Sequence, residues 1–118
     1  MKVCDFFDMI SNVKIDNAKV KELEKIYGLD IPTTIKSIVS VSNKPIFVEG
    51  YRILSFSEIV DADEDLEVNF SERQLLPVID CGDNDFIVYD MGKDCWTKFN
   101  IIELCVFSQK KDLKQIMR

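Results

Sequence analysis

Apolar residues recur at helical spacing through the first third of the chain. Four of them share one face of residues 3–11 and predict a short amphipathic helix: Val3, Phe6, Phe7 and Ile10. A second helix is expected to start at Asp16 or Asn17, either of which can cap it, and to end at Gly28, which can adopt the left-handed conformation. A third helix is expected to have Pro32 as its first residue.

The middle of the chain shows short strand patterns and then a helix-start pattern. Two short strands, residues 46–48 and 52–54, are expected on either side of the turn residues 49–50. The serine at Ser55 is followed three residues later by Glu58, which is the capping-box pattern. A short helix is therefore expected after the second strand.

The pattern changes to that of strands after residue 74. Three segments, residues 75–80, 86–89 and 95–99, are separated by turn-forming residues and predict an antiparallel meander. Pro77 requires the first strand to lie at a sheet edge or to carry a bulge. The second strand is almost entirely apolar, so we expect both of its faces to be covered. The third alternates, so we expect one of its faces to be in water.

Helical signals return at the C-terminal end. Asn100 and Glu103 are expected to open a helical turn, and residues 112–117 to form a final short helix. The order of elements predicts an α+β fold, with a small, mainly antiparallel sheet, N-terminal helices packed on it and a short C-terminal helix. The length of 118 residues corresponds to a single domain, residues 1–118.

Composition narrows the classes of partner. The net charge of −6 argues against nucleic acid and anionic membranes, which select Lys/Arg-rich surfaces. It favours a cationic partner, or serves solubility alone.

The sequence shows no signal for export or membrane insertion. The N-terminal residues lack the apolar run of a signal peptide, and no segment has the length of a membrane span. The four cysteines are widely spaced, so we expect reduced thiols in a cytoplasmic protein without a bound metal or cofactor.

The chain has no histidine, which removes the commonest general base and most metal sites. Carboxylates are too numerous to single out a pair for glycoside hydrolysis. Residues 81–85, CGDND, lie between two expected strands, where Asp83 and Asp85 could bind a cation or act as paired acids. A hairpin turn, in which Gly, Asn and Asp supply the turn conformations, is the other interpretation of these residues. Cys81 has no basic neighbour in sequence, so we expect an ordinary thiol.

Residues 61–72, DADEDLEVNFSE, resemble the calcium loop of an EF-hand. Acidic residues occupy the first, third, fifth and twelfth positions of that loop. Its sixth position needs a positive φ and is normally glycine, but here it is Leu66. Val68 and Phe70 alternate with polar residues, which suits an extended segment. We therefore expect an acidic, solvated connection from helix to strand, and keep a calcium-binding module as a remote alternative.

Three motifs, in their order along roughly residues 15–100, carry a family resemblance. They are the helix junction ELEKIYGLDIP at residues 22–32, the stretch LSFSE at 54–58, and the hairpin LPVIDCGDN at 76–84, which leads to Tyr89 and Asp90. Together they resemble the SUKH superfamily. Its bacterial members include immunity proteins against polymorphic toxins, and its fungal members include a regulator of cell-wall synthesis.

The resemblance implies a non-enzymatic protein-binding domain that neutralises a protein toxin by covering its active site. If the toxin is a nuclease, its phosphate-binding cleft is basic, and surplus carboxylates on an inhibitor can mimic the substrate and speed association. The expected partner contacts are the acids of the connection, three residues of the hairpin loop, and Tyr89 or Trp96 as an aromatic anchor, although Trp96 also fits a core position. They are Asp61, Asp63, Glu64, Asp65, Glu67, Asp83, Asn84, Asp85, Tyr89 and Trp96. The alternative is a regulatory or scaffolding domain, and the protein is expected to be a monomer or a homodimer.

Overall fold

The computed structural model describes residues 1–117, which form seven helices and one six-stranded sheet. The helices are α1 (Val3–Ser11), α2 (Asn17–Tyr27), α3 (Thr33–Val41), α4 (Phe56–Val60), α5 (Ala62–Asp65), α6 (Phe70–Arg73) and α7 (Leu113–Ile116). The strands are β1 (Ile46–Val48), β2 (Tyr51–Ile53), β3 (Leu75–Gly82), β4 (Asp85–Asp90), β5 (Cys95–Asn100) and β6 (Cys105–Lys110). Among these residues no helix is both long and apolar enough to cross a membrane.

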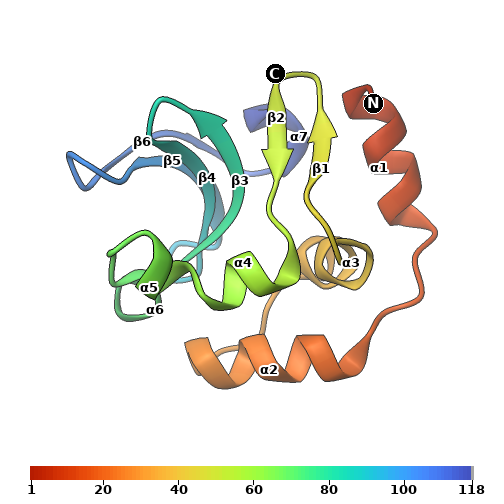
Figure 1. The fold of residues 1–118 in the computed structure, drawn as a ribbon, viewed down its shortest axis with the longest axis horizontal. Helices are drawn as coiled ribbons and strands as arrows, with labels where there is room; N and C mark the ends of the chain where they lie inside the picture. The colour runs from red at the N-terminus through yellow and green to blue at the C-terminus, as the bar shows by residue number, and fades with distance from the viewer. Residues whose placement is uncertain (118) are drawn as a thin grey trace.

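The sheet is an antiparallel meander in which every strand pairs with its neighbour in sequence, in the order β1-β2-β3-β4-β5-β6. The α+β class, the N-terminal helices and the short C-terminal helix are as predicted. In Figure 1, α1 and α3 lie on the β1 side of the molecule, and α2 and α4 run across its lower part. The strands β3 to β6 curve away on the other side.

The predicted helix-end signals are confirmed for α2. The Asp16 side chain accepts hydrogen bonds from the backbone N–H groups of Ala18 and Lys19, which have no partner inside the helix. Gly28 ends the helix with a φ of 73°, a conformation that costs a residue with a Cβ more than it costs glycine. The expectation for Pro32 was one residue early, because α3 begins at Thr33 and Pro32 occupies the N-cap.

The capping box at the start of α4 is confirmed. Ser55 Oγ accepts from the Glu58 N–H, and Glu58 Oε1 accepts from the Ser55 N–H at 3.0 Å. The same carboxylate forms an ion pair with Arg52 of β2, so it joins helix and sheet. Burial acts to raise the pKa of Glu58, but the hydrogen bonds from Ser55 and Arg52 outweigh it and lower the pKa.

Strands β3 and β4 form the centre of the core, and the four residues Phe86–Tyr89 of β4 are all buried as expected. Pro77 lies in a central strand rather than at an edge, and the register shift between Pro77 and Ile79 supplies the expected bulge. The strand β2 pairs with β3 only at Ile79 and Asp80. Pro77, which has no N–H, therefore lies beyond the end of that pairing.

Two expectations for the C-terminal part were wrong. Cys95, Trp96 and Thr97 are consecutive and all at most 4% exposed, so β5 is covered on both faces rather than on one. Asn100 opens a hairpin turn and not a helical one, since the chain reverses and returns as the unpredicted strand β6. The chain reverses direction at Leu104, which has a φ of 56°.

The expectation of an extended segment at residues 67–70 was also wrong. The acidic connection contains two helical turns, α5 and α6, and Val68 and Phe70 are both buried. The ring of Phe70 packs edge-on against that of Phe99 of β5, with centroids 5.7 Å apart. The apolar residues of this segment therefore anchor α6 on the sheet.

We predict that Glu58→Gln destabilises the fold in a pH-dependent way. A carboxyl whose pKa is lowered by folding stabilises the native state above its unfolded pKa, and this contribution disappears as the pH falls through the folded value. The difference in urea unfolding free energy between wild type and variant should thus be largest near neutral pH and shrink in acid. A difference that is constant from neutral pH down to about pH 3, below the reference pKa of a glutamate, would contradict this account.

Candidate protein-binding surface

The antiparallel meander places alternate turns at the same end of the sheet. The β1–β2, β3–β4 and β5–β6 turns share one end, where the Ile101 N–H donates to the Asn84 carbonyl at 3.0 Å. The β4–β5 turn and α6 share the other end, where the Met91 N–H donates to the Gln74 carbonyl at 2.9 Å. Side chains far apart in sequence therefore form two separate surfaces.

The predicted contact residues divide between these two ends. The acids of the connection, residues 61–67, lie in and around α5, at one end of β3, whereas the β3–β4 turn is at its other end (Figure 1). Asp83, Asn84 and Asp85 belong to this turn. The eight residues of β3 separate the two groups, and a strand of that length spans roughly 26 Å. The structure does not bring the predicted acids into one site.

Within the acidic connection, Asp63 has a structural role. Its carboxylate accepts from Ser71 Oγ at 2.6 Å and from the Ser71 N–H, which lies in the first turn of α6. Asp63 is half-buried, whereas four neighbouring acids are exposed to solvent: Asp61, Glu64, Asp65 and Glu67. Asp63 fastens α5 to α6 and is a poor choice for a partner contact.

The geometry of this segment differs from that of a calcium loop. Leu66 has a φ of −100°, and the positive φ falls one residue later, at Glu67. The carboxylate of Asp63 is already engaged by Ser71. In residues 1–117, no three carboxylate, cysteine or histidine side chains gather closely enough to hold a metal ion.

The β3–β4 turn has the conformation of a tight two-residue hairpin. Asp83 and Asn84 have φ values of 53° and 68°, which Asp and Asn tolerate better than other residues with a Cβ. They connect the paired residues Gly82 and Asp85. Asp85 accepts a hydrogen bond from Asn100 Nδ2 at 2.8 Å, which ties this turn to β5.

An open pocket of about 270 Å³ lies next to this turn, between the first two strands and the end of β3. Its lining residues are Phe47, Gly50, Tyr51, Arg52, Asp80, Cys81 and Gly82. The strand register puts the side chains of Phe47, Arg52 and Asp80 on one face of the sheet and that of Tyr51 on the other. Phe47 is 68% exposed, the second largest exposure among the large apolar residues described. Arg52 lies directly opposite Asp80 in the strand register and forms its ion pair with Glu58.

We name this region the hairpin surface and define it by its aromatic and polar side chains: Phe47, Tyr51, Asp80, Asp83, Asn84 and Asp85. It presents carboxylates beside an exposed ring and a pocket. Sequence reasoning found only its β3–β4 turn. Phe47 was missed because an exposed aromatic residue in a three-residue strand has no signal of its own, although the alternation of turns predicts that the β1–β2 turn lies at this end.

The two other predicted contacts, Tyr89 and Trp96, are buried. They are 7% and 4% exposed, and their rings pack edge-on with centroids 5.3 Å apart. The Tyr89 hydroxyl donates to Asp94, and burial, followed by this carboxylate, raises its pKa. Neither ring is presented to a partner, so the core position considered for Trp96 is the one observed.

The thiol in the pocket is not activated. Burial raises the pKa of Cys81 to about 11, and Asp80 and Asp85 add to this effect, while Lys98 opposes it. Burial, followed by Cys81, also raises the pKa of Tyr51. The hairpin surface therefore offers negative charge and aromatic area, but no reactive nucleophile near neutral pH.

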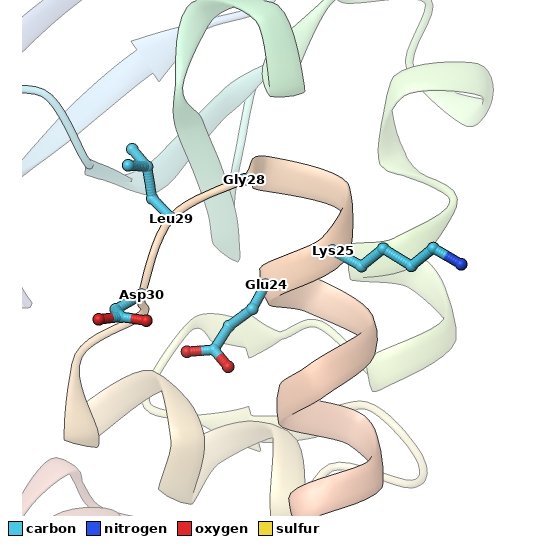
Figure 2. Close-up of a pocket in the computed structure, with 5 residues that line it drawn as sticks. All are labelled: Glu24, Lys25, Gly28, Leu29 and Asp30. Carbon is cyan, nitrogen blue, oxygen red and sulfur yellow. The ribbon is translucent and has the colours of Figure 1, made fainter.

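A larger open pocket, of about 440 Å³, lies where α2 turns into α3, and is lined by Glu24, Lys25, Gly28, Leu29 and Asp30. Figure 2 shows Lys25 pointing away from Glu24 and Asp30. Glu24 Oε2 accepts from the Ile31 N–H at 3.4 Å, so its carboxylate helps to close this bend. We interpret this pocket as part of the helix junction.

The chain matches no protein-family model, no curated protein and no solved structure. The resemblance to the SUKH superfamily, which rests on residues 22–32, 54–58 and 76–84, stays a prediction.

We predict that Cys81 is alkylated much more slowly than the exposed Cys4 when the folded protein is treated with iodoacetamide near neutral pH. Its thiolate is scarce below its pKa of about 11, so its rate should rise roughly tenfold per pH unit while the fold persists. Peptide mass spectrometry of quenched samples measures both rates. Equal rates at Cys4 and Cys81 would show that the pocket thiol is activated.

We predict that Asp63→Ala lowers stability by about 1 kcal/mol, because it removes the acceptor for the start of α6. Asp65→Ala, at an exposed position of the same segment, is the matched control and should change the stability little.

We also predict that calcium leaves the melting temperature of the wild type unchanged, since only a ligand that binds the native state raises it. A rise that Asp63→Ala abolishes would restore the calcium alternative.

Proposed function

We propose that this chain is a non-enzymatic protein-binding domain that neutralises a toxin with a basic surface, as the SUKH resemblance implies. One observation carries the proposal: the hairpin surface combines clustered carboxylates with the exposed ring of Phe47 and an open pocket. Apolar anchors surrounded by polar groups are typical of protein interfaces. A net charge of −6 supports a partner of opposite sign.

The chemistry of the pocket favours a lysine or arginine side chain from the partner. A cation is attracted both to the face of an aromatic ring, here Phe47, and to the carboxylate of Asp80, which the strand register puts on the same face of the sheet. Such a side chain is what a nuclease uses to bind phosphate. Occupying it with Asp80 would prevent substrate binding without any chemical step.

The exposed acids of the acidic connection have a different role in this proposal. They lie at the far end of β3 from the hairpin surface (Figure 1), so they attract a cationic partner over a distance rather than contact it. Exposed charges separated by more than about 10 Å interact weakly in physiological salt. Their loss should therefore affect association rate modestly and leave the bound complex intact.

The proposal places the protein in the cytoplasm of the cell that makes the toxin. Its four cysteines are free, as a reducing compartment allows.

The test is capture of the tagged chain from its own host, followed by co-expression with the recovered partner. The partner should carry a basic domain whose expression kills cells, and this chain should relieve that effect.

The double variant Asp83→Asn, Phe47→Ser should raise the dissociation constant of the complex with this partner at least roughly tenfold, or 1.4 kcal/mol. Asparagine tolerates the left-handed turn, so the fold should persist.

The matched control is Asp65→Asn, which removes one exposed charge from the acidic connection. It should leave affinity nearly unchanged. If the chain gives no protection against any captured protein, the proposed function is wrong. If protection depends on Asp65 and not on Asp83 or Phe47, the function holds but the hairpin surface is the wrong contact.

A further inference from the structure

Strand β6 forms one edge of the sheet and is exposed along all six of its residues. Within the described residues, β5 is the one strand that pairs with it. Four large apolar side chains gather in β6 and the turn before it, with exposed fractions of 70%, 46%, 48% and 40%: Ile102, Leu104, Val106 and Phe107. An apolar edge strand of this kind is a template for pairing with another strand.

The backbone of β6 offers hydrogen-bonding groups at Val106. Thr97 Oγ1 of β5 donates to the Phe107 carbonyl at 2.8 Å, so that carbonyl faces β5. In an antiparallel strand, adjacent residues direct their N–H and C=O groups to opposite sides. The N–H and C=O of Val106 therefore face away from β5, toward an incoming strand.

The second half of β6 carries features that discourage pairing, and the first half does not. Ser108 has a φ of 57°, and Ser108 and Gln109 together oppose Thr97, which makes a bulge. Lys110 adds a charge at the strand end. A bulge and a lysine are common ways of blocking a sheet edge. Pairing is thus favoured about Cys105, Val106 and Phe107.

We propose that a second copy of this chain pairs antiparallel with β6 about Val106. The two Val106 residues would exchange both of their outward hydrogen bonds across a two-fold axis, and the two sheets would join into one. Cys105 of each copy would then lie opposite Phe107 of the other, so the cross-strand pairs next to the axis are apolar. The interface is isologous and closes at a dimer.

Charge complementarity argues for a second copy as the occupant. The strand has an acidic residue, Glu103, just before its start and a basic one, Lys110, at its end. Antiparallel pairing of identical strands lays each start against the other end. Backbone pairing ends before these two residues, because the chain turns at Leu104 and bulges at residues 108–109. Glu103 of one copy and Lys110 of the other nevertheless lie at the same end of the interface, within reach of their long side chains, and this happens at both ends.

The dimer is independent of the proposed function. Antiparallel pairing directs the hairpin surfaces of the two copies toward opposite ends of the joined sheet, so neither covers the other. A dimer can therefore bind a partner at each hairpin surface. The dimer can be present or absent whether or not a toxin exists.

The experiment is sedimentation velocity of the full chain over a range of concentrations. The wild type should approach the mass of two chains. Val106→Lys should raise the dimer dissociation constant at least roughly tenfold. Phe47→Lys is the matched control, because Phe47 is exposed on β1, at the opposite edge of the sheet, and this variant should still dimerise.

Charge exchange tests the pairing without altering the apolar residues. Glu103→Lys and Lys110→Glu should each weaken the dimer, and the double variant should restore it, since the opposite charges meet again. Circular dichroism establishes that each variant is folded. A wild type that stays monomeric at every concentration, a dimer that survives both Val106→Lys and the single charge reversals, or one that Phe47→Lys abolishes, would overturn the proposal.

Discussion

Antiparallel pairing of each strand with its neighbour in sequence is the constraint on which the rest of this structure depends. It forces consecutive turns to alternate between the two ends of the sheet. The turns at residues 49–50, 83–84 and 101–104 therefore meet at one end, and the helical connection 61–73 lies at the other. The hairpin surface, which is made by the first two of these turns, exists only because the backbone hydrogen bonds of the sheet hold the strands in this order.

Much of the fold is visible in the sequence where a local signal and the tertiary structure agree. Gly28, the Ser55–Glu58 capping box and the Asp83–Asn84 turn each need a particular backbone conformation that few other residues adopt easily. The apolar residues 86–89 need burial on both faces, which only a central strand supplies. These features depend on a few neighbouring residues, so they can be predicted without knowledge of distant contacts.

The errors arose where a local hydrogen-bonding pattern was identified correctly, but the path of the chain after it depended on residues far away in the sequence. Asn100 accepts from the N–H groups of residues 102 and 103, as the cap of a helix does. The chain nevertheless reverses at Leu104, because β5 offers a free edge on which β6 can pair. A strand exposed over its whole length has no alternation of buried and exposed positions, so its sequence lacks the usual signal.

The candidate site shows the same division between local and tertiary information. The acids of the β3–β4 turn were found because Asp and Asn are typical of tight turns. The carboxylate of Asp63 was indistinguishable from its neighbours in sequence, although it is committed to Ser71. Trp96, one of the expected contacts, is buried, whereas Phe47, for which no role was expected, is exposed. The residues that cover Trp96 come from parts of the chain that the local pattern does not include.

The two proposed contacts depend on different forces, and this difference explains how one small chain can hold both. The hairpin surface acts through carboxylates, whose attraction for a basic partner extends into solution. Strand β6 contains no acidic residue, although the chain has 21 of them. Two copies that each carry a charge of −6 repel one another, so they approach most easily where the surface lacks carboxylates. The apolar edge of β6 meets that condition, and its hydrogen bonds and side-chain packing act only at contact.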